Sequence, residues 1–382
     1  MANEIPLVSV IVPMYNSEKF IGELLNSLLG QTLKNFEVII VDDCSTDYSC
    51  ALVESYMPQF EGRLYLVKIK SNTGGPSLPR NKGLEVSRGK YVFFMDNDDA
   101  LTRGALEFMY NFAEHFQAEI VCCKKHFESH GFAQDFLKNM TVVGNAEDNK
   151  LEVTVGDFQQ KVRAWMYQGF LGVVPWTKFI LRNFLVENDI KWLPVIQEDS
   201  IWTFELACLT KKCVLIPQPV YVARMRADSF GHTALFAKNL DAKSLKLKMD
   251  RVVNGLKHID NFMSGIEGFQ KSPELRYEVL SYITFQNLNW VIGTYPNVPP
   301  HLLYETFKAA FPNNFGDNDV LVSALFTAAV TFIKNNTILR QQISTTPPHF
   351  RIKINLMRKI YVRKNWIRRA DFEHTAGVRR AA

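Results

Sequence analysis

The sequence predicts an α/β protein with a doubly wound, mostly parallel sheet flanked by helices, followed by a mainly α-helical C-terminal extension. Two observations carry this prediction. Short apolar runs of strand character alternate with segments of helical periodicity through the first 100 residues, which is typical of βαβ units. Several of these runs end in polar or acidic residues, as strands do at the ligand-binding edge of an open α/β sheet.

The apolar runs predict four buried strands, at residues 7–12, 36–41, 64–69 and 91–95. Pro13 is expected to close the first strand. The helix that follows begins after Ser17, which is a good N-cap residue. The glycine-rich turn 72–76 opens the helix that carries Arg80, and residues 101–116 are apolar at helical spacing. This alternation predicts right-handed crossovers between neighbouring parallel strands.

The fourth predicted strand, 91–95, leads directly into Asp96, Asp98 and Asp99, which are interrupted only by Asn97. Three adjacent carboxylates repel one another unless a cation lies between them, and hard oxygen ligands suit Mg²⁺ or Mn²⁺. A cation with few protein ligands keeps its other positions for water and phosphate oxygens. The alternative is an acidic turn that only caps the next helix.

Two further strand ends and one helix start also carry groups suited to a nucleotide. Tyr15 follows Pro13, and its ring can stack on a base. Asp42 and Asp43 follow the second strand, and a carboxylate can accept a base N–H. Arg80 lies in the first turns of a helix, where the helix dipole favours phosphate, although a single arginine is more often a surface ion-pair partner. The chain has no G-x-G-x-x-G fingerprint and no P-loop.

Four segments resemble the successive blocks of family 2 glycosyltransferases, namely 8–16, 41–47, 72–83 and 94–99. The resemblance implies the A-type glycosyltransferase fold and a donor that is commonly a UDP-sugar. It implies that Tyr15 and Asp43 hold the uracil, with Pro13 shaping the pocket. The chain departs from the family at Cys44, where a glycine is usual, and the larger side chain is expected to tighten this pocket without abolishing it.

The same resemblance implies roles around the diphosphate. Arg80 approaches the diphosphate, and Asp96 approaches the ribose or the metal ion. Asn97 belongs to the same nucleotide-sugar-binding set. Asp98 is expected to be the main protein ligand of Mn²⁺ or Mg²⁺, with Asp96 beside it.

Two later segments, 173–179 and 197–202, resemble the acceptor-side blocks of these enzymes. The resemblance implies that Asp199 is the general base that takes the proton of an acceptor hydroxyl, in a single displacement with inversion. Glu198 is expected to orient the base or to bind the acceptor, and Trp176 to bind the acceptor. Without the resemblance, the acid pair would be first-turn dipole compensation, and Trp176 and Trp192 would be core or cleft-wall residues.

A third segment, 221–232, resembles the family's closing strand and flexible loop. Arg226 and Ser229 are therefore candidates to approach the donor phosphates. His232 is a candidate metal ligand, although an exposed loop histidine is the commoner case.

Four regions are expected along the chain: a nucleotide-binding half (1–99), an acceptor-side half (100–235), a helical extension (236–345) and a basic amphipathic tail (346–382). Residues 351–382 hold ten Lys or Arg against two Asp or Glu, whereas the whole chain has a net charge of +5. Residues 350–372 interleave these cations with apolar and aromatic residues, which suits an anionic membrane surface. A solvated helix is the alternative, and no RNA-binding motif accompanies the segment. The apolar window 320–333 is too short to span a bilayer.

The N-terminus lacks a signal-peptide pattern, and the six cysteines lack metal-ligand spacing. We therefore expect reduced thiols and a cytoplasmic protein, peripheral at the inner face of the plasma membrane. The predicted function is metal-assisted, inverting transfer from a UDP-sugar to a glycan or lipid-linked glycan, as in bacterial capsule, lipopolysaccharide or teichoic acid synthesis. The alternatives are a non-catalytic glycan-binding or assembly protein and a sugar nucleotidyltransferase, which would need a glycine-rich basic loop after its first strand.

Overall fold

The computed structural model describes residues 5–129, 140–144, 149–154, 156–226 and 242–272, with shorter pieces at 275–276, 278–280, 282–283 and 286–287. The chain divides into two compact units, Met1–Ser229 and Phe230–Ala382. The domain boundary predicted at 235 lies outside the described residues.

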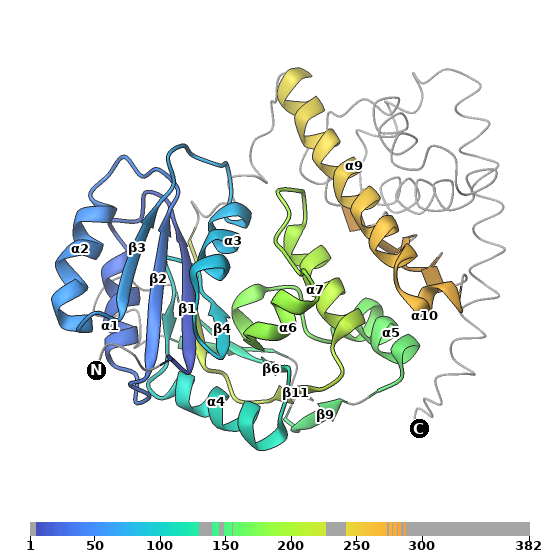
Figure 1. The fold of residues 1–382 in the computed structure, drawn as a ribbon, viewed down its shortest axis with the longest axis horizontal. Coiled ribbons are helices and arrows are strands. Elements are labelled where there is room, and N and C mark those ends of the chain that lie inside the picture. Colours follow the sequence, from blue (N-terminus) through green and yellow to red (C-terminus); the bar gives the residue numbers. More distant parts are fainter. Residues whose placement is uncertain are drawn as a thin grey trace. The chain divides into compact units, whose positions relative to one another are not determined.

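The first unit contains an eight-stranded sheet with the strand order β3-β2-β1-β4-β10-β6-β11-β9 (Figure 1). Four parallel strands form one half: β1 (Val8–Met14), β2 (Phe36–Asp42), β3 (Leu64–Lys68) and β4 (Tyr91–Phe94). The other half consists of β6 (Ile120–Cys123), β9 (Glu152–Thr154), β10 (Lys178–Leu181) and β11 (Cys213–Ile216). Among the described strands of this sheet, only β10 and β9 run antiparallel to their neighbours. The predicted mostly parallel sheet is therefore confirmed.

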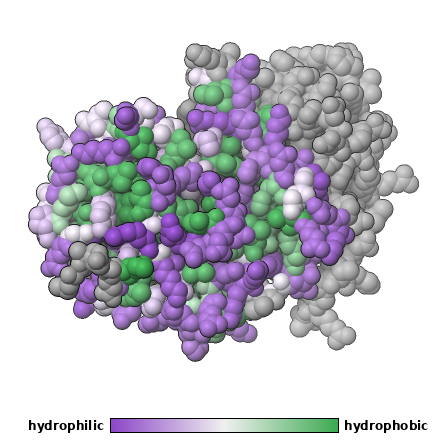
Figure 2. All heavy atoms as spheres, viewed as in Figure 1, coloured by the Kyte–Doolittle hydropathy of each residue, from purple (hydrophilic) through white to green (hydrophobic). Residues whose placement is uncertain are grey.

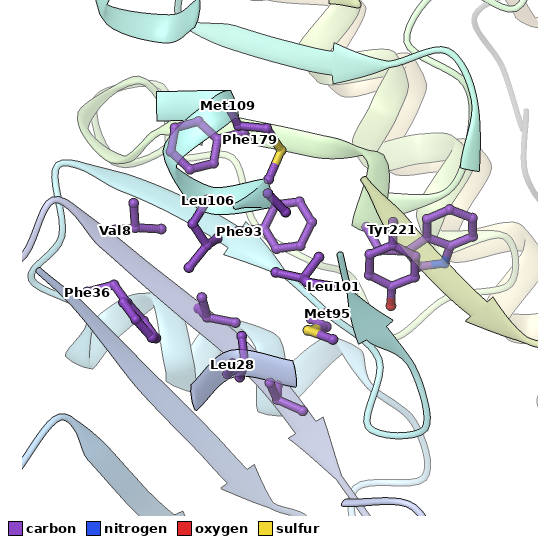
Figure 3. Packing of buried hydrophobic residues seen from close by; sticks show 14 of the residues in the cluster. Val8, Leu28, Phe36, Phe93, Met95, Leu101, Leu106, Met109, Phe179 and Tyr221 are labelled. Atoms are coloured by element: carbon purple, nitrogen blue, oxygen red, sulfur yellow. The ribbon is translucent and has the colours of Figure 1, made fainter. Parts of the chain in front are cut away.

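Every residue of β1 and β2 is buried. Since successive side chains of a strand point to opposite faces, both faces of this sheet are covered. Val8, Val10 and Val12 belong to a core cluster that they share with α1 (Ile21–Leu29), α2 (Ser49–Phe60) and α4 (Ala105–Phe116). Figure 3 shows side chains of α1, α4 and the strands meeting in this cluster. On the opposite face, Gly83 of α3 (Ser77–Val86) lies against Ile11 so closely that a Cβ at this glycine would be 2.3 Å from the isoleucine Cγ2. In the view of Figure 2, apolar residues show mainly over the strands and hydrophilic residues surround them.

A second sheet of the same unit has the order β5-β12-β7-β8. Its strands are β5 (Ala100–Leu101), β7 (His126–Ser129), β8 (Met140–Val143) and β12 (Tyr221–Arg224). The unit is completed by α5 (Phe158–Gln168), the 3-10 turn η2 (Pro175–Thr177), α6 (Arg182–Glu187) and α7 (Glu198–Leu209). Strand β5 directly follows the acidic segment 96–99. Because β12 pairs with β5, residues 221–224 lie close to the end of β4.

In the second unit, the described residues include the helices α9 (Ala242–Ser264) and α10 (Glu267–Gln270), as expected for a helical extension. No helix among the described residues is long and apolar enough to cross a bilayer. The apolar window 320–333 and the predicted basic tail 346–382 lie outside these residues.

Three local predictions were wrong. Strand β1 continues through Pro13 to Met14 in register with β2. Helix α1 begins at Ile21 rather than after Ser17, because the Ser17 hydroxyl donates to the Tyr15 carbonyl and does not cap the helix. Leu101 belongs to strand β5, and α4 begins only after Gly104, whose φ of 83° lies in the left-handed region. In the first case the pairing with β2 extends the strand, and in the third a residue in the left-handed region separates the strand from the helix.

A buried carboxylate links the amino-terminal half of β1 to the segment before β4. The Glu37 carboxylate accepts hydrogen bonds from the Ser9 hydroxyl at 2.6 Å and from the Arg88 backbone N–H at 2.7 Å. The Arg88 guanidinium also donates to this carboxylate, at 2.8 Å from Nη2 and 3.0 Å from Nε. The Gly89 N–H donates to the Ser9 hydroxyl at 2.8 Å. A Cβ at Gly89 would lie 2.5 Å from the Ser9 backbone nitrogen, so only glycine fits without a backbone shift.

Candidate active site

The predicted nucleotide-side residues gather at the carboxyl edge of the parallel strands. The Asn97 amide donates to the Pro13 carbonyl at 3.1 Å, which joins the segment after β4 to the end of β1. The Asp43 N–H donates to the Met14 carbonyl at 2.8 Å, which joins the end of β2 to the same place. Tyr15 is 47% exposed, so its side chain is accessible to a ligand. The strand order therefore brings together residues that are distant in the sequence.

Asp43 is buried and is held by a residue that the sequence analysis did not single out. Its carboxylate accepts both the N–H and the hydroxyl of Thr73 at 3.0 Å. Thr73 stands in the glycine-rich turn that had been noted only for its glycines. Cys44 has a φ of 67°, in the left-handed region that glycine adopts most readily. This backbone conformation accounts for the glycine usual at that position, and the Cys44 side chain occupies it at the cost of some strain.

Arg80 connects residues predicted for the nucleotide side with the residue predicted as the base on the acceptor side. Its side chain extends from α3 and the residue is only 3% exposed. Nη2 lies 2.9 Å from Oδ1 of Asp96, and Nη1 lies 3.3 Å from Oδ1 of Asp199. The predicted diphosphate-side acid and the predicted base thus share one buried guanidinium. A buried arginine needs such compensation, because an unpaired charge in the interior is costly.

An aromatic stack supports this guanidinium. The Arg80 Cζ lies 4.4 Å from the ring centroid of Trp192. The Trp192 ring stacks on Trp202 with centroids 4.1 Å apart and planes 18° apart. Phe94 meets both indoles edge-on, at 5.4 and 5.6 Å. Trp192 is thus a buried core residue, which is one of the two roles, core or cleft wall, that were expected for it. Its contact with Arg80 had no signal in the local sequence.

The remaining acids of the segment 96–99 have separate partners. The Oδ2 atom of Asp98 lies 2.8 Å from the Nε atom of Arg226. Asp99 is buried and accepts the Tyr221 hydroxyl at 2.6 Å and the Arg224 N–H at 2.7 Å. Burial raises the pKa of both carboxyls, and neighbouring aspartates raise it further. Asp99 therefore attaches β12 to this segment, while Asp98 lies beside an arginine and Asp96 remains partly exposed.

The predicted base, Asp199, lies in the first turn of α7 between cations and acids. Burial raises its pKa; of the nearby charges, Arg80 and Lys178 lower the pKa and Asp96 raises it. Lys178 is fully buried, donates to the Val174 carbonyl at 2.5 Å, and has its pKa lowered by burial. Lys178 belongs to the segment 173–179, but its proximity to the acid pair depends on the sheet and has no signal in the local sequence.

Trp176, predicted to bind the acceptor, is only 9% exposed. Its ring stacks on Tyr221 with centroids 4.4 Å apart and planes 9° apart, and His126 meets it edge-on at 4.8 Å. The side chain thus supports the tyrosine that binds Asp99. Its role in acceptor binding stays a prediction.

Glu198 has a raised pKa of about 7, because burial and the adjacent Asp199 disfavour its charged form. The native state therefore binds more protons than the unfolded state between about pH 4.5 and pH 7, so this carboxyl lowers stability as the pH rises through that range. We expect Glu198→Gln to remove about 1–2 kcal/mol of this pH dependence, allowing for partial solvent screening. Urea unfolding at pH 5 and pH 7.5 measures the difference. If the free energy of unfolding changed between these two pH values by the same amount in the variant as in the wild type, Glu198 would not be the source of this pH dependence.

Among the described residues, no group of three or more His, Cys, Asp or Glu side chains is placed to hold a metal ion. Ser229, predicted to approach the donor phosphates, and His232, the candidate metal ligand, lie outside the described residues, whereas Arg226 is described and contacts Asp98.

Comparison with known proteins agrees with this geometry. Residues 9–172 match the family model described as glycosyl transferase family 2. A poly(ribitol-phosphate) β-glucosyltransferase of Bacillus spizizenii is 34% identical over 152 residues, which cover 39% of this chain and 24% of the relative. The poly(ribitol-phosphate) β-N-acetylglucosaminyltransferase TarS of Staphylococcus aureus is 40% identical over 133 residues, which cover 34% of this chain and 23% of the relative. The matched segments thus span about a quarter of the length of these two relatives.

The crystal structure of S. aureus TarS residues 1–349 in complex with UDP-GlcNAc superposes with a TM-score of 0.57 at 23% identity. The superposition covers 84% of this chain and 81% of that structure, and it establishes the similarity of fold. The mostly parallel sheet and the similarity to this structure show that the chain has the A-type glycosyltransferase fold, and the segment 9–172 matches glycosyl transferase family 2.

Proposed function

We propose that the protein is an inverting, metal-assisted glycosyltransferase that moves a sugar from a UDP-sugar to a hydroxyl group of a glycan acceptor. The observation that carries this proposal is the bridge made by Arg80 between Asp96 and Asp199. A transferase must hold its donor diphosphate and its acceptor base within one reaction site, and here the two acids share one guanidinium.

In this proposal the uracil lies at the ends of β1 and β2. Tyr15 offers a half-exposed ring for stacking, and Asp43 offers a carboxylate that Thr73 holds in place. Pro13 shapes the pocket from the end of β1. Asn97, bonded to the Pro13 carbonyl, stands between this pocket and the acids that follow β4.

The diphosphate is assigned to the cationic side chains around these acids. The support is that Arg80 lies within ion-pair distance of Asp96 and Arg226 within ion-pair distance of Asp98. Ser229 is assigned to the same role on the resemblance alone. Asp96 would contact the ribose or share in metal binding.

Asp96 and Asp98 are the residues that would hold a divalent cation in this proposal. The two carboxylates are close enough that the negative charge of Asp96 raises the pKa of Asp98. Mg²⁺ is commonly bound through one or two carboxylates plus substrate phosphates and waters, so a larger protein ligand set is not needed. When bound, the cation neutralises charge on the departing diphosphate.

The chemistry on the acceptor side is assigned to Asp199. Burial raises the pKa of Asp199 and so makes its carboxylate more basic, while Arg80 and Lys178 act in the opposite direction. Such a carboxylate can take the proton of the attacking hydroxyl. Attack from the side opposite the leaving group inverts the anomeric centre. Glu198 and Trp176 are assigned to the acceptor side, with the glutamate beside the base in the first turn of α7.

The acceptor is proposed to be a bacterial surface glycan or a lipid-linked precursor of one. The support is the names of the relatives, which are transferases of poly(ribitol-phosphate), and the TarS structure holds UDP-GlcNAc. Membrane-surface binding through residues 350–372 is a further part of this proposal, on residues outside the described ones.

Calorimetric titration of UDP, with and without Mn²⁺, tests the donor site. We expect wild-type binding to need the cation and Asp98→Asn to weaken it at least about tenfold, because a lost charged ligand costs more than 1.4 kcal/mol. Glu85→Gln is the matched control, since its side chain is 67% exposed and the charge change is the same. No UDP binding to the wild type under either condition would overturn the donor assignment.

A further inference from the structure

We propose that Trp192 is a positioning residue for glycosyl transfer: its indole face fixes the plane of the Arg80 guanidinium, so that one terminal nitrogen meets Asp96 and the other meets Asp199. The inference rests on the proposed function only for the role of Asp199 as the base. Trp192 touches neither donor nor acceptor in this scheme and acts through the arginine.

The two carboxylates alone do not determine the plane of the Arg80 guanidinium. Two single contacts, one from each terminal nitrogen, leave the group free to tilt about the line that joins its partners. The contact with the Trp192 ring, at 4.4 Å, removes that freedom, and such a contact is strongest where water is excluded. Arg80 is almost completely buried, so this condition holds.

Trp192 is itself held by residues of three elements of the site. The side chain of Asn81 bonds the backbone of Trp192 twice, accepting from its N–H at 2.8 Å and donating to its carbonyl at 2.7 Å. Asn81 directly follows Arg80 in α3, Trp202 lies in α7 one turn after the base, and Phe94 ends β4. The indole is therefore fixed by the same three elements that present the two acids and the arginine.

Four charged side chains surround Asp199. These are Arg80 from α3, Asp96 from the segment after β4, Lys178 from β10 and Glu198 from α7. Arg80 is the stronger of the two cations in lowering the pKa of Asp199 and is also the one that donates a hydrogen bond to it. At 3.3 Å, this bond is longer than the bond to Asp96, so a tilt of the guanidinium weakens it first. The base would then hold its proton to a higher pH.

The test compares Trp192→Phe with Trp192→Leu. Phenylalanine keeps an aromatic face, whereas leucine keeps apolar bulk and loses the face. The carboxyl titration of Asp199 is followed by ¹³C NMR on aspartate-labelled protein, with Asp199→Asn to assign the signal. We expect the leucine variant to raise the titration midpoint by about half a pH unit to one unit and the phenylalanine variant to stay near the wild type. In turnover, the acid limb of the pH profile of kcat should move by the same amount.

A purely structural tryptophan would give another pattern. The leucine variant would then lose thermal stability while the Asp199 midpoint and the acid limb stayed at their wild-type values, and this result would overturn the inference. Arg80→Lys serves if the leucine variant does not fold, because it leaves the aromatic stack intact and removes the planar group. We expect the same upward shift from it, and an unchanged midpoint would count equally against the inference. A wild type without transferase activity would refute the proposed function, and the NMR titration would still decide the role of Trp192.

Discussion

Asp199→Asn is expected to lower the turnover number about 10²- to 10⁴-fold while the affinity for UDP changes little. Asparagine has the shape of aspartate and can still lie beside Arg80, but it cannot take the proton of the attacking hydroxyl. The acceptor would then have to lose its proton to water. Initial rates of UDP release from a panel of UDP-sugars, together with UDP calorimetry, measure the two quantities separately.

The control for this variant is again Glu85→Gln, which removes one negative charge from an exposed side chain. It should leave both turnover and UDP affinity within twofold of the wild type, at a cost of less than about 0.5 kcal/mol. If Asp199→Asn keeps turnover within tenfold of the wild type, Asp199 is not the base. Glu198, which lies beside it, would then be the next residue to test.

Gly89→Ala is expected to lower the free energy of unfolding by about 3 kcal/mol or more, from overpacking and a lost buried hydrogen bond together. The added Cβ would lie 2.5 Å from the Ser9 nitrogen and 2.7 Å from the Val8 carbonyl carbon. Both are backbone atoms of β1, which is paired on both sides and has little freedom to move. A shift there would also break the bond from the Gly89 N–H to the Ser9 hydroxyl, and with it the set of bonds that satisfies Glu37.

Gly75→Ala provides the comparison, because no atom lies within 4 Å of a Cβ built at that position. We expect its free energy of unfolding to stay within about 0.5 kcal/mol of the wild type. Urea unfolding of the two variants under the same conditions measures the difference. Equal stability of the two would show that the segment before β4 can move away from β1.

The sequence predicted the parallel half of the sheet because its strands are buried on both faces, and such strands read as continuous apolar runs. The polar residues after these runs then had to meet at one edge, which is where the structure places Tyr15, Asp43 and Asp96. The short strand β10 had no comparable signal. Its four residues pair with β4 and β6, and neither partner is near it in the chain.

The contacts that surround the acids were not predictable for the same reason. The bond between Thr73 and Asp43, the burial of Lys178 near Asp199, and the stack of Trp192 on Trp202 all depend on tertiary structure. Local sequence carries the residue types but not these pairings. Asp99 is an example. Its position beside Asp98 suggested a shared cation site, but its carboxylate instead accepts hydrogen bonds from the Tyr221 hydroxyl and the Arg224 N–H.

The bridge that Arg80 makes between Asp96 and Asp199 has a consequence for how the protein can evolve. A substitution at either acid leaves a buried positive charge with only one carboxylate, so the effect of the second substitution depends on whether the first is present. The three positions therefore form one epistatic unit that spans both halves of the first compact unit. Drift at Asp96 is therefore constrained by Asp199, and a change at Asp96 would require a compensating change at Arg80 or Asp199.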